Sequence, residues 1–197
     1  LQAVKTFQKI LAAHSTDMNP GPRVVADLQR LLFAKNNSTL ADRDQKYLDG
    51  LSNLQRQNAG QPVEGEIGLA LANYWLEKGQ QFDPEKGEQG RFDFKTAHDI
   101  AQDIVRRFPE TYAAKQCKAL IANILRKEIY PQTEEVSLPG KPILAALNYL
   151  NVDKIQVRVI RWSQDLEEEL GKLHSPENQT DLIQEQPVLN AFSQNLT

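Results

Sequence analysis

The spacing of the apolar residues changes part-way along this chain, at Ile129-Tyr130-Pro131. Up to Arg126 they recur every three or four positions, which is the period of a helix that buries one face. From Val136 they cluster and alternate with polar residues, as in β-strands. The pattern predicts an α+β protein with a helical domain over residues 1–130 and an antiparallel β-domain over residues 131–197.

Six helical stripes separated by short turns are visible in the first part of the chain. They run over Val4–Leu11, Val24–Leu32, Leu40–Leu54, Ile67–Trp75, Phe94–Val105 and Ala113–Leu125. Polar residues Asn36 to Thr39 are predicted to cap the third helix. The stretch from Gln80 to Arg91, rich in Pro, Gly and charge, is predicted to be an exposed loop. Short connections between successive helices favour three stacked α-hairpins.

One hairpin has features of a tetratricopeptide-type (TPR) repeat. Four small residues are predicted to let its helices approach closely: Ala97, Ala101, Ala113 and Ala114. Pro109 keeps the distance from Ala97 that is usual in that motif. Tyr74 and Trp75 are adjacent on a helix, so they cannot both face the same core. One of the two rings is expected to face a neighbouring hairpin or a groove. Simple packing is the favoured role of the pair, and binding of a peptide or a partner domain is the alternative.

The second part of the chain contains short strand-like segments. The predicted elements are an edge strand at Glu134–Leu138, a strand at Ile143–Leu150, a turn at Asn151–Lys154, a strand at Ile155–Ile160, a short helix at Leu166–Leu173 and a strand at Val188–Phe192. A helix is the alternative for Ile143–Leu150. Two or three strands do not make a stable sandwich. The β-domain is therefore expected to be incomplete, and the chain to be a piece of a longer protein.

Composition narrows the function classes only slightly. The net charge of −3 argues against nucleic acid as the main partner, since a phosphate-binding face needs excess Lys and Arg. The apolar runs are far shorter than a membrane span. The single cysteine, Cys117, excludes an internal disulfide framework.

Three segments of the chain resemble a known family. They are Arg107–Thr111, Ala114–Ile121 and Asn148–Val159, the last with an "N-Y-x-N-V" strand end followed by a "V-R-V" strand. Together they lie in Ala97–Trp162, which resembles the N-terminal region of the large alpha-2-macroglobulin-like proteins of Bacteroidetes. In that family a TPR-like helical region runs into the first macroglobulin-type β-sandwich domains, and the third segment corresponds to a hairpin.

The resemblance implies an exported protein of the periplasm or outer membrane, often a lipoprotein, that traps or restrains proteases. Its partners would be proteins: the downstream β-domains of the same chain, proteases or peptides. Membrane attachment would come only through an anchor outside this sequence. Thioester-bearing members need a Cys-Gly-Glu-Gln motif, whereas Cys117 is followed by Lys118-Ala119-Leu120. No thioester site is carried over.

Other candidate chemical groups favour structural interpretations. The three histidines, His14, His98 and His174, have no cysteine or carboxylate at metal-ligand spacing. Cys117 lies on an apolar stripe and is expected to be a buried packing thiol. The carboxylates Asp99 and Asp103 and the acidic run Glu167–Glu169 are expected to be solvated rather than catalytic. No catalytic, cofactor-binding or metal-binding residue is predicted.

The sequence thus favours a non-enzymatic structural and protein-interaction segment of a large envelope protein of the alpha-2-macroglobulin-like type. The first alternative is an independent TPR-like adaptor that binds peptides. The second, less favoured, is a hydrolase that uses scattered carboxylates.

Overall fold

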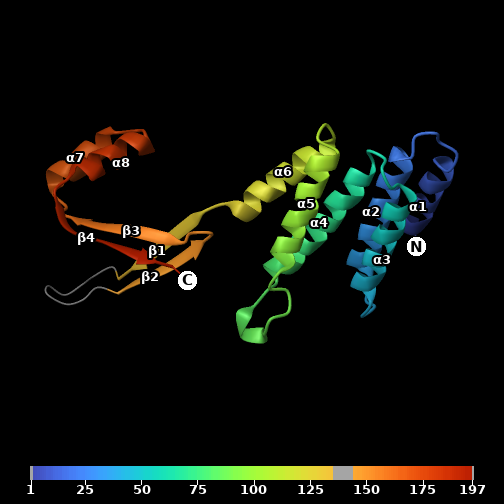
Figure 1. Ribbon diagram of the computed structural model, residues 1–197, viewed down its shortest axis with the longest axis horizontal. Helices are drawn as coiled ribbons and strands as arrows, with labels where there is room; N and C mark the ends of the chain where they lie inside the picture. Colours follow the sequence, from blue (N-terminus) through green and yellow to red (C-terminus); the bar gives the residue numbers. More distant parts are fainter. Residues whose placement is uncertain (1, 135–143, 197) are drawn as a thin grey trace. The chain divides into compact units, whose positions relative to one another are not determined.

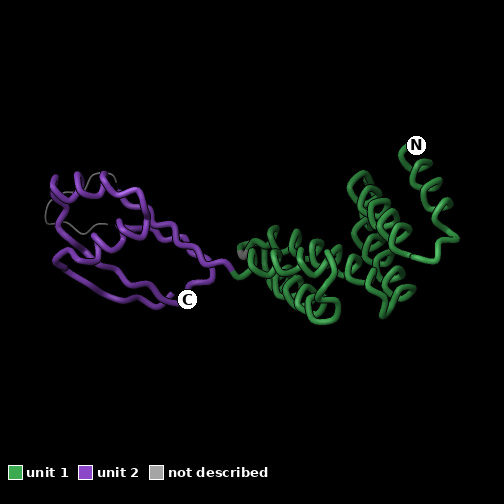
Figure 2. Tube along the Cα trace, turned by 90° about the horizontal axis from the view of Figure 1, so that it is seen from above, with its two compact units in different colours: residues 1–125 green, residues 126–197 purple. Residues whose placement is uncertain are grey.

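The computed structural model of the protein describes residues 2–134 and 144–196, and it shows an α+β fold. The chain divides into two compact units, Leu1–Leu125 and Arg126–Thr197, coloured green and purple in Figure 2. Helices make up the first unit, and two antiparallel ladders with two helices make up the second (Figure 1). The predicted helical array followed by a short antiparallel segment is therefore confirmed as the fold class.

Unit 1 contains six α-helices in the order expected from the apolar stripes. They are α1 (Gln2–Ala13), α2 (Gly21–Asn37), α3 (Arg43–Gln57), α4 (Glu64–Gln80), α5 (Asp93–Arg107) and α6 (Tyr112–Leu125). A short 3₁₀ turn, η1 (Pro84–Lys86), lies in the loop between α4 and α5. Figure 1 shows this loop projecting beyond the ends of the two helices that it joins. The predicted loop over residues 80–91 thus matches a segment with little regular structure.

Helix α4 is the centre of unit 1 because it contacts α2, α3, α5 and α6. Two buried clusters meet on it. The first joins α2, α3 and α4 through Val24, Tyr47, Leu51, Leu54, Ile67 and Tyr74. The second joins α4, α5 and α6 through Ala72, Ala101, Ile104, Ala113, Cys117 and Leu120. Opposite faces of one helix therefore bury apolar side chains against two different pairs of neighbours, which links the helices into one array.

Close approach of α4, α5 and α6 depends on small side chains. The four alanines predicted to allow it are fully buried, which confirms their role in packing. Two glycines of α4, Gly65 and Gly68, likewise leave room for the side chains of α5 and α6. A β-carbon built at Gly68 would lie 2.4 Å from Cδ1 and 2.6 Å from Cγ1 of Ile104 in α5. The side chain of Ile104 therefore occupies the space that any larger residue at position 68 would need.

We expect Gly68→Ala to lower the free energy of unfolding by about 1–2 kcal/mol. The clash with buried Ile104 costs about 1–3 kcal/mol, as overpacking does, and the better helix propensity of alanine returns less than about 1 kcal/mol. Gly65→Ala is the milder comparison on the same helix, because its β-carbon would lie 3.2 Å from that of Ala113, a tight contact that a shift of a few tenths of an ångström relieves. Urea unfolding followed by circular dichroism at 222 nm compares the two. Equal stability of both variants would contradict the packing argument.

The capping prediction for the third helix is wrong. Asn36 and Asn37 belong to the last turn of α2, where the side-chain amide of Asn37 donates to the carbonyl of Phe33 at 2.8 Å. Ser38 accepts from the backbone N–H of Leu40 and so forms a local turn rather than a helix cap. Helix α3 begins only at Arg43. Local side-chain bonds to the backbone compete with capping, and here they extend one helix and delay the next.

Unit 2 is built from two separate two-stranded ladders. Strand β1 (Glu128–Thr133) pairs with β2 (Ala145–Leu150), and β3 (Lys154–Ile160) pairs with β4 (Val188–Asn195). Helices α7 (Gln164–Lys172) and α8 (Pro176–Glu185) lie in the connection between β3 and β4. The predicted strand at Ile143–Leu150, as far as the structure describes it, the strand after the turn at Asn151–Lys154, the short helix and the last strand are confirmed. Their ends differ from the predicted ones by no more than three residues. Strand β1 and helix α8 were not predicted.

The hairpin predicted over Asn148–Val159 is wrong, because β2 and β3 pair with different strands. The amide of Asn151 donates to the carbonyl of Arg126 and holds the end of β2 beside the start of β1. Across the same bend, the backbone N–H of Leu196 donates to the carbonyl of Asp153. The bend, with Asn151 at a φ of 53°, thus passes the chain from one ladder to the other.

The period change at Ile129–Pro131 lies inside a strand rather than between two domains. Strand β1 starts at Glu128, and the two units divide after Leu125. Pro131 is tolerated there because a two-stranded ladder has edge strands only, and an edge strand need not donate a bond at every position. The predicted edge strand at Glu134–Leu138 lies outside the described residues, apart from Glu134.

Unit 2 buries little of its apolar surface in the part of the chain that the structure describes. Leu166 is the one buried hydrophobic side chain there. Many large hydrophobic side chains are exposed: Ile129, Tyr130, Leu144, Tyr149, Leu150, Val159, Trp162, Ile183, Val188, Leu189 and Phe192. Two-stranded ladders are marginal in water unless a further strand or helix covers them.

Candidate functional site

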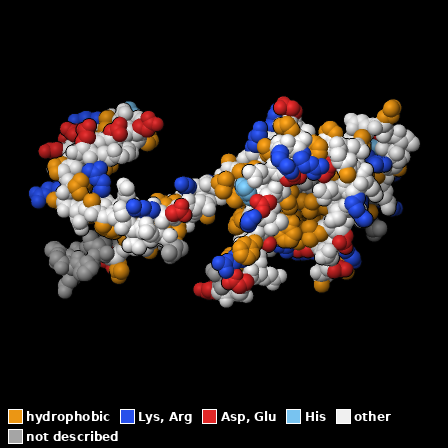
Figure 3. Space-filling view, viewed as in Figure 1, with side chains coloured by type: hydrophobic (Ala, Val, Ile, Leu, Met, Phe, Trp, Pro, Cys, Tyr) orange, Lys and Arg blue, Asp and Glu red, His pale blue; other side chains and the backbone are white. Residues whose placement is uncertain are grey.

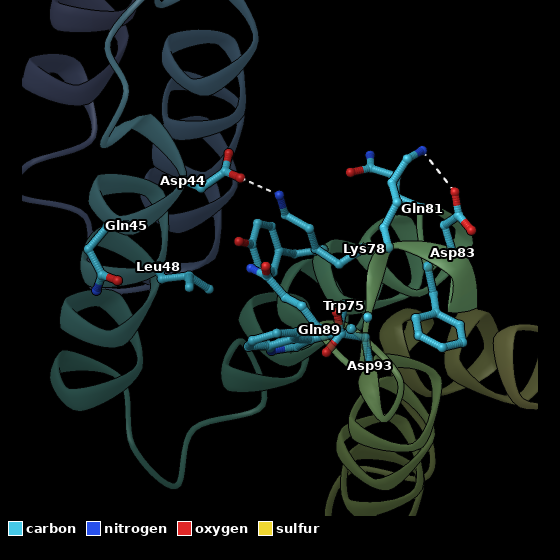
Figure 4. A pocket seen from close by; sticks show the side chains of 14 residues that line it. Asp44, Gln45, Leu48, Trp75, Lys78, Gln81, Asp83, Gln89 and Asp93 are labelled. Atoms are coloured by element: carbon cyan, nitrogen blue, oxygen red, sulfur yellow. Dashed lines mark ion pairs between the residues drawn. The ribbon is translucent and has the colours of Figure 1, made fainter.

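An open recess of about 590 Å³ lies in unit 1 between α3 and the loop that joins α4 to α5. Its walls come from the N-terminal half of α3, from the loop and from the start of α5, and its floor is the C-terminal half of α4 (Figure 4). The volume is in the range of pockets that bind small molecules or short peptide segments. In Figure 3, hydrophobic side chains gather in a hollow over the middle of unit 1.

The aromatic pair of α4 forms the floor of the recess. Tyr74 is 6% exposed and belongs to the cluster between α2, α3 and α4, while Trp75 is partly exposed. Their ring centroids lie 5.2 Å apart in an edge-to-face arrangement. Both residues pack on the same cluster and both line the recess, so the two expected roles of packing and groove lining are combined. Trp75 is the ring that stays open to a ligand.

A buried lysine supports the floor from the opposite side. Lys35 of α2 is 7% exposed, and its Nζ lies 2.7 Å from Oε2 of Glu77. The same Nζ is 5.2 Å from the centroid of Tyr74 and 5.6 Å from that of Tyr47. Burial raises the pKa of both tyrosines, so their hydroxyls remain protonated. A cation held against two rings and a carboxylate gives Tyr74 a fixed position.

An ion pair bridges α3 and α4 at one end of the recess. Nζ of Lys78 lies 2.5 Å from Oδ2 of Asp44, drawn as a dashed line in Figure 4. The bond between them lowers the pKa of Asp44 and raises that of Lys78. Both groups are therefore charged at neutral pH, and each is largely neutralised by the other.

The loop forms the opposite wall. Asp83 accepts from the backbone N–H of Glu85 and pairs with Lys86 at 2.8 Å, which holds the 3₁₀ turn. Gly87 and Gly90 have φ values of 113° and 89°, in the left-handed region that glycine adopts without strain. These bends bring Gln89 and then Asp93, the first residue of α5, to the recess.

Asp93 differs from the other carboxylates of the recess. In Figure 4 it lies beside Gln89 and Trp75, at the end away from Asp44. Among the described residues, no Lys, Arg or His forms an ion pair with it. It lies in the first turn of α5, where the helix N-terminus attracts negative charge. It therefore carries an uncompensated negative charge next to an aromatic ring.

The other candidate acid–base carboxylates, Asp99, Asp103 and Glu167–Glu169, lie outside this recess. Asp99 is exposed and Asp103 is half-buried on α5, and they pair with Lys95 and Arg106, at 2.7 and 2.5 Å. Bonds from these cations lower the pKa of both carboxylates. In the acidic run, Glu167 lies 3.4 Å from the indole nitrogen of Trp162. Asp99 and Asp103 are therefore charged at neutral pH, and the side chains of the acidic run are exposed to solvent.

The histidines and the cysteine are also separate from one another. His14 contacts Asp17 at 2.7 Å, His98 contacts Asp99 at 3.1 Å, and His174 is exposed in unit 2. No group of three or more potential metal ligands is found in the described part of the chain. Cys117 is fully buried in the cluster between α4, α5 and α6, and burial raises the pKa of its thiol to about 11. It is a packing thiol, as expected from its stripe.

No family model, curated protein or solved structure matches this chain. The site must therefore be interpreted from its own residues. No helix in the residues described is both long enough and apolar enough to cross a membrane.

Most residues of the recess were not identifiable in advance. The Tyr74-Trp75 pair was singled out, and it does line the recess. Asp44, Lys78 and Asp93 carry no local signal, because charged residues at these spacings are ordinary on exposed helix faces. Only the predicted loop from Gln80 to Arg91 indicated a binding site, because long irregular connections in compact domains often carry binding residues.

Proposed function

We propose that this chain is a non-enzymatic structural and protein-interaction segment, in which unit 1 binds an extended peptide in its recess. The observation that carries the proposal is the partly exposed indole of Trp75 on the floor of an open, mixed polar and apolar recess. Large aromatic rings in partly enclosed pockets dominate the binding energy of protein interfaces. Side-chain amides from Gln45, Gln81 and Gln89 line the same recess and suit the amide groups of a peptide backbone.

The wider proposal is that the segment belongs to a large alpha-2-macroglobulin-like protein of the cell envelope. It is supported by the sequence resemblance and by the order of a helical array before antiparallel ladders. The exposed apolar side chains of unit 2 support it too, because its ladders need further strands to bury them. On this proposal unit 1 docks partners and the inhibition of proteases belongs to the whole protein.

The reading frame of the gene tests the wider proposal. An export signal upstream and further β-domains downstream are expected if the segment belongs to this family. A frame that holds neither would overturn this assignment. The adaptor alternative would then be preferred, and it is favoured by the fact that unit 1 has its own core and recess.

A peptide-binding measurement tests the role of the recess. The probe is a pool of fluorescein-labelled heptapeptides with Ala, Ser, Leu, Asn, Arg, Lys, Gln or Glu at every position. We expect weak binding to the full chain, measured by fluorescence anisotropy, and a loss of at least about tenfold in affinity in Trp75→Ala, because an aromatic anchor contributes about 2 kcal/mol or more.

Trp162→Ala is the control for this measurement, since Trp162 is the second tryptophan and lies exposed in unit 2. It should bind the pool as the unchanged protein does. Binding that is unaffected by Trp75→Ala, or lost equally in both variants, would contradict a peptide site in the recess.

A further inference from the structure

The charges that line the recess are not balanced. Three carboxylates, from Asp44, Asp83 and Asp93, face two ammonium groups, from Lys78 and Lys86. Each lysine is held by one aspartate, Lys78 by Asp44 and Lys86 by Asp83. The remaining carboxylate, that of Asp93, therefore sets the net charge of the recess.

The surroundings of Asp93 match those that proteins use to bind an organic cation. Trp75 presents its indole on the same side of the recess, and Figure 4 shows the two side chains together with Gln89 between α4 and the loop. Tryptophan is the ring that binds cations most strongly, and a nearby carboxylate adds a charge-assisted hydrogen bond. Elsewhere in unit 1 the protein uses the same combination internally, where Lys35 lies against two tyrosine rings and Glu77.

We propose that the recess is specific for a peptide segment with an arginine or lysine side chain, which packs on Trp75 and pairs with Asp93. This inference rests on the proposed function, because it names the class of peptide that the same recess takes. A peptide is favoured over a free amine because the recess extends from Asp93 to Asp44 past three glutamine amides. A single cation would leave most of that surface empty.

Four peptide pools test this specificity. Each pool contains heptapeptides with a central residue fixed as Arg, Lys, Gln or Glu, and an equal mixture of Ala, Ser, Leu and Asn at the other positions. The protein carries Trp162→Phe, so that its intrinsic fluorescence reports Trp75 alone. We expect the Arg and Lys pools to bind about tenfold more tightly than the Gln pool, and the Glu pool to bind most weakly.

Asp93→Asn separates the cation site from peptide binding in general. We expect it to reduce the affinity for the Arg pool to that for the Gln pool, and to leave the affinity for the Gln pool unchanged. Asp99→Asn is the matched control, because Asp99 lies on the same helix but is paired with Lys95 outside the recess. It should preserve the preference for the Arg pool.

Each outcome has one meaning. Equal binding of all four pools, or a preference that survives Asp93→Asn, overturns the cation inference and leaves the peptide proposal standing. Absence of binding by every pool, in a protein whose circular dichroism shows it to be folded, overturns both. Tighter binding of the Glu pool would assign the recess to acidic peptides and overturn the inference as well.

Discussion

Replacing Leu51 with alanine is expected to lower the free energy of unfolding by about 3 kcal/mol. Leu51 of α3 is 0% exposed and lies in the cluster shared by α2, α3 and α4. Truncation of a fully buried leucine removes its transfer free energy and leaves a cavity, at a cost of about 2–5 kcal/mol. Tyr47 and Tyr74, which frame this cluster, also position the floor of the recess, so the same change should weaken peptide binding.

Urea unfolding of the full chain, followed by circular dichroism at 222 nm, measures the effect. Leu40→Ala is the control, because it is the same substitution at a position that is 54% exposed and outside the helices. We expect that variant to be within about 0.5 kcal/mol of the unchanged protein. A similar loss in both variants would mean that α2, α3 and α4 do not share the core described above.

The second large effect is expected at Arg107, which joins the end of α5 to the start of α4. Its guanidinium binds Glu64 at two points, 2.8 Å to Oε1 and 2.6 Å to Oε2. Oε2 also accepts the backbone N–H of Gly60 at 2.7 Å. The side chain of Glu64 is 4% exposed and that of Arg107 is 34% exposed. The pair therefore clamps the turn before α4 onto the end of the following helix.

We expect Arg107→Met to cost about 2 kcal/mol in stability. Loss of one partner of a fully buried pair costs about 3–5 kcal/mol, and the value is reduced here because water reaches the arginine. Methionine keeps an apolar stem near the ring of Phe108, which the guanidinium carbon approaches to 4.8 Å from its centroid. The double variant with Glu64→Gln should cost about 1 kcal/mol less than the sum of the two single changes.

Arg106→Met is the matched control, because Arg106 is 77% exposed and pairs only with Asp103 among the described residues. Its effect should be below about 0.5 kcal/mol.

The pH dependence of stability gives a second measurement of the Glu64–Arg107 pair. Bonds from Arg107 hold the pKa of Glu64 below its ordinary value of 4.5, so the stabilisation is complete above that pH and is lost as the pH falls through the lowered pKa. The stability gap between the unchanged protein and Arg107→Met should therefore narrow below pH 4.5. A gap that is constant down to acid denaturation would contradict the clamp.

The helices were predictable because their information is local. A stripe such as Val24 to Leu32 has one period, and any helix with that period must bury the stripe. The close packing of α5 and α6 was predictable for the same reason, since alanines on their facing stripes leave room for a neighbouring backbone. The start of α3 was missed because Ser38 can bond its own local backbone as well as cap a helix.

The pairing of the strands was harder to predict from the sequence. The segments that form β2 and β3 have strand periodicity, and three residues between them would suit a hairpin. Each instead pairs with a strand that the pattern did not name as its partner: β1, which was not predicted, and β4, which was predicted but lies beyond two helices in the sequence. Periodicity indicates that one face of a strand is buried, but it does not identify the strand with which it pairs.

Local pattern alone thus determines the change from helices to strands, the number of helices in unit 1 and the burial of Cys117, because each depends on neighbours a few residues away. The recess and the clamp depend on side chains much farther apart in the sequence, such as Glu64 and Arg107, which are 43 positions apart. Asp44, Trp75 and Asp93 come from three elements that meet only when α4 has packed against its neighbours. The spacing of charged and aromatic residues in the sequence does not predict such long-range contacts. Only the tertiary structure brings these side chains together.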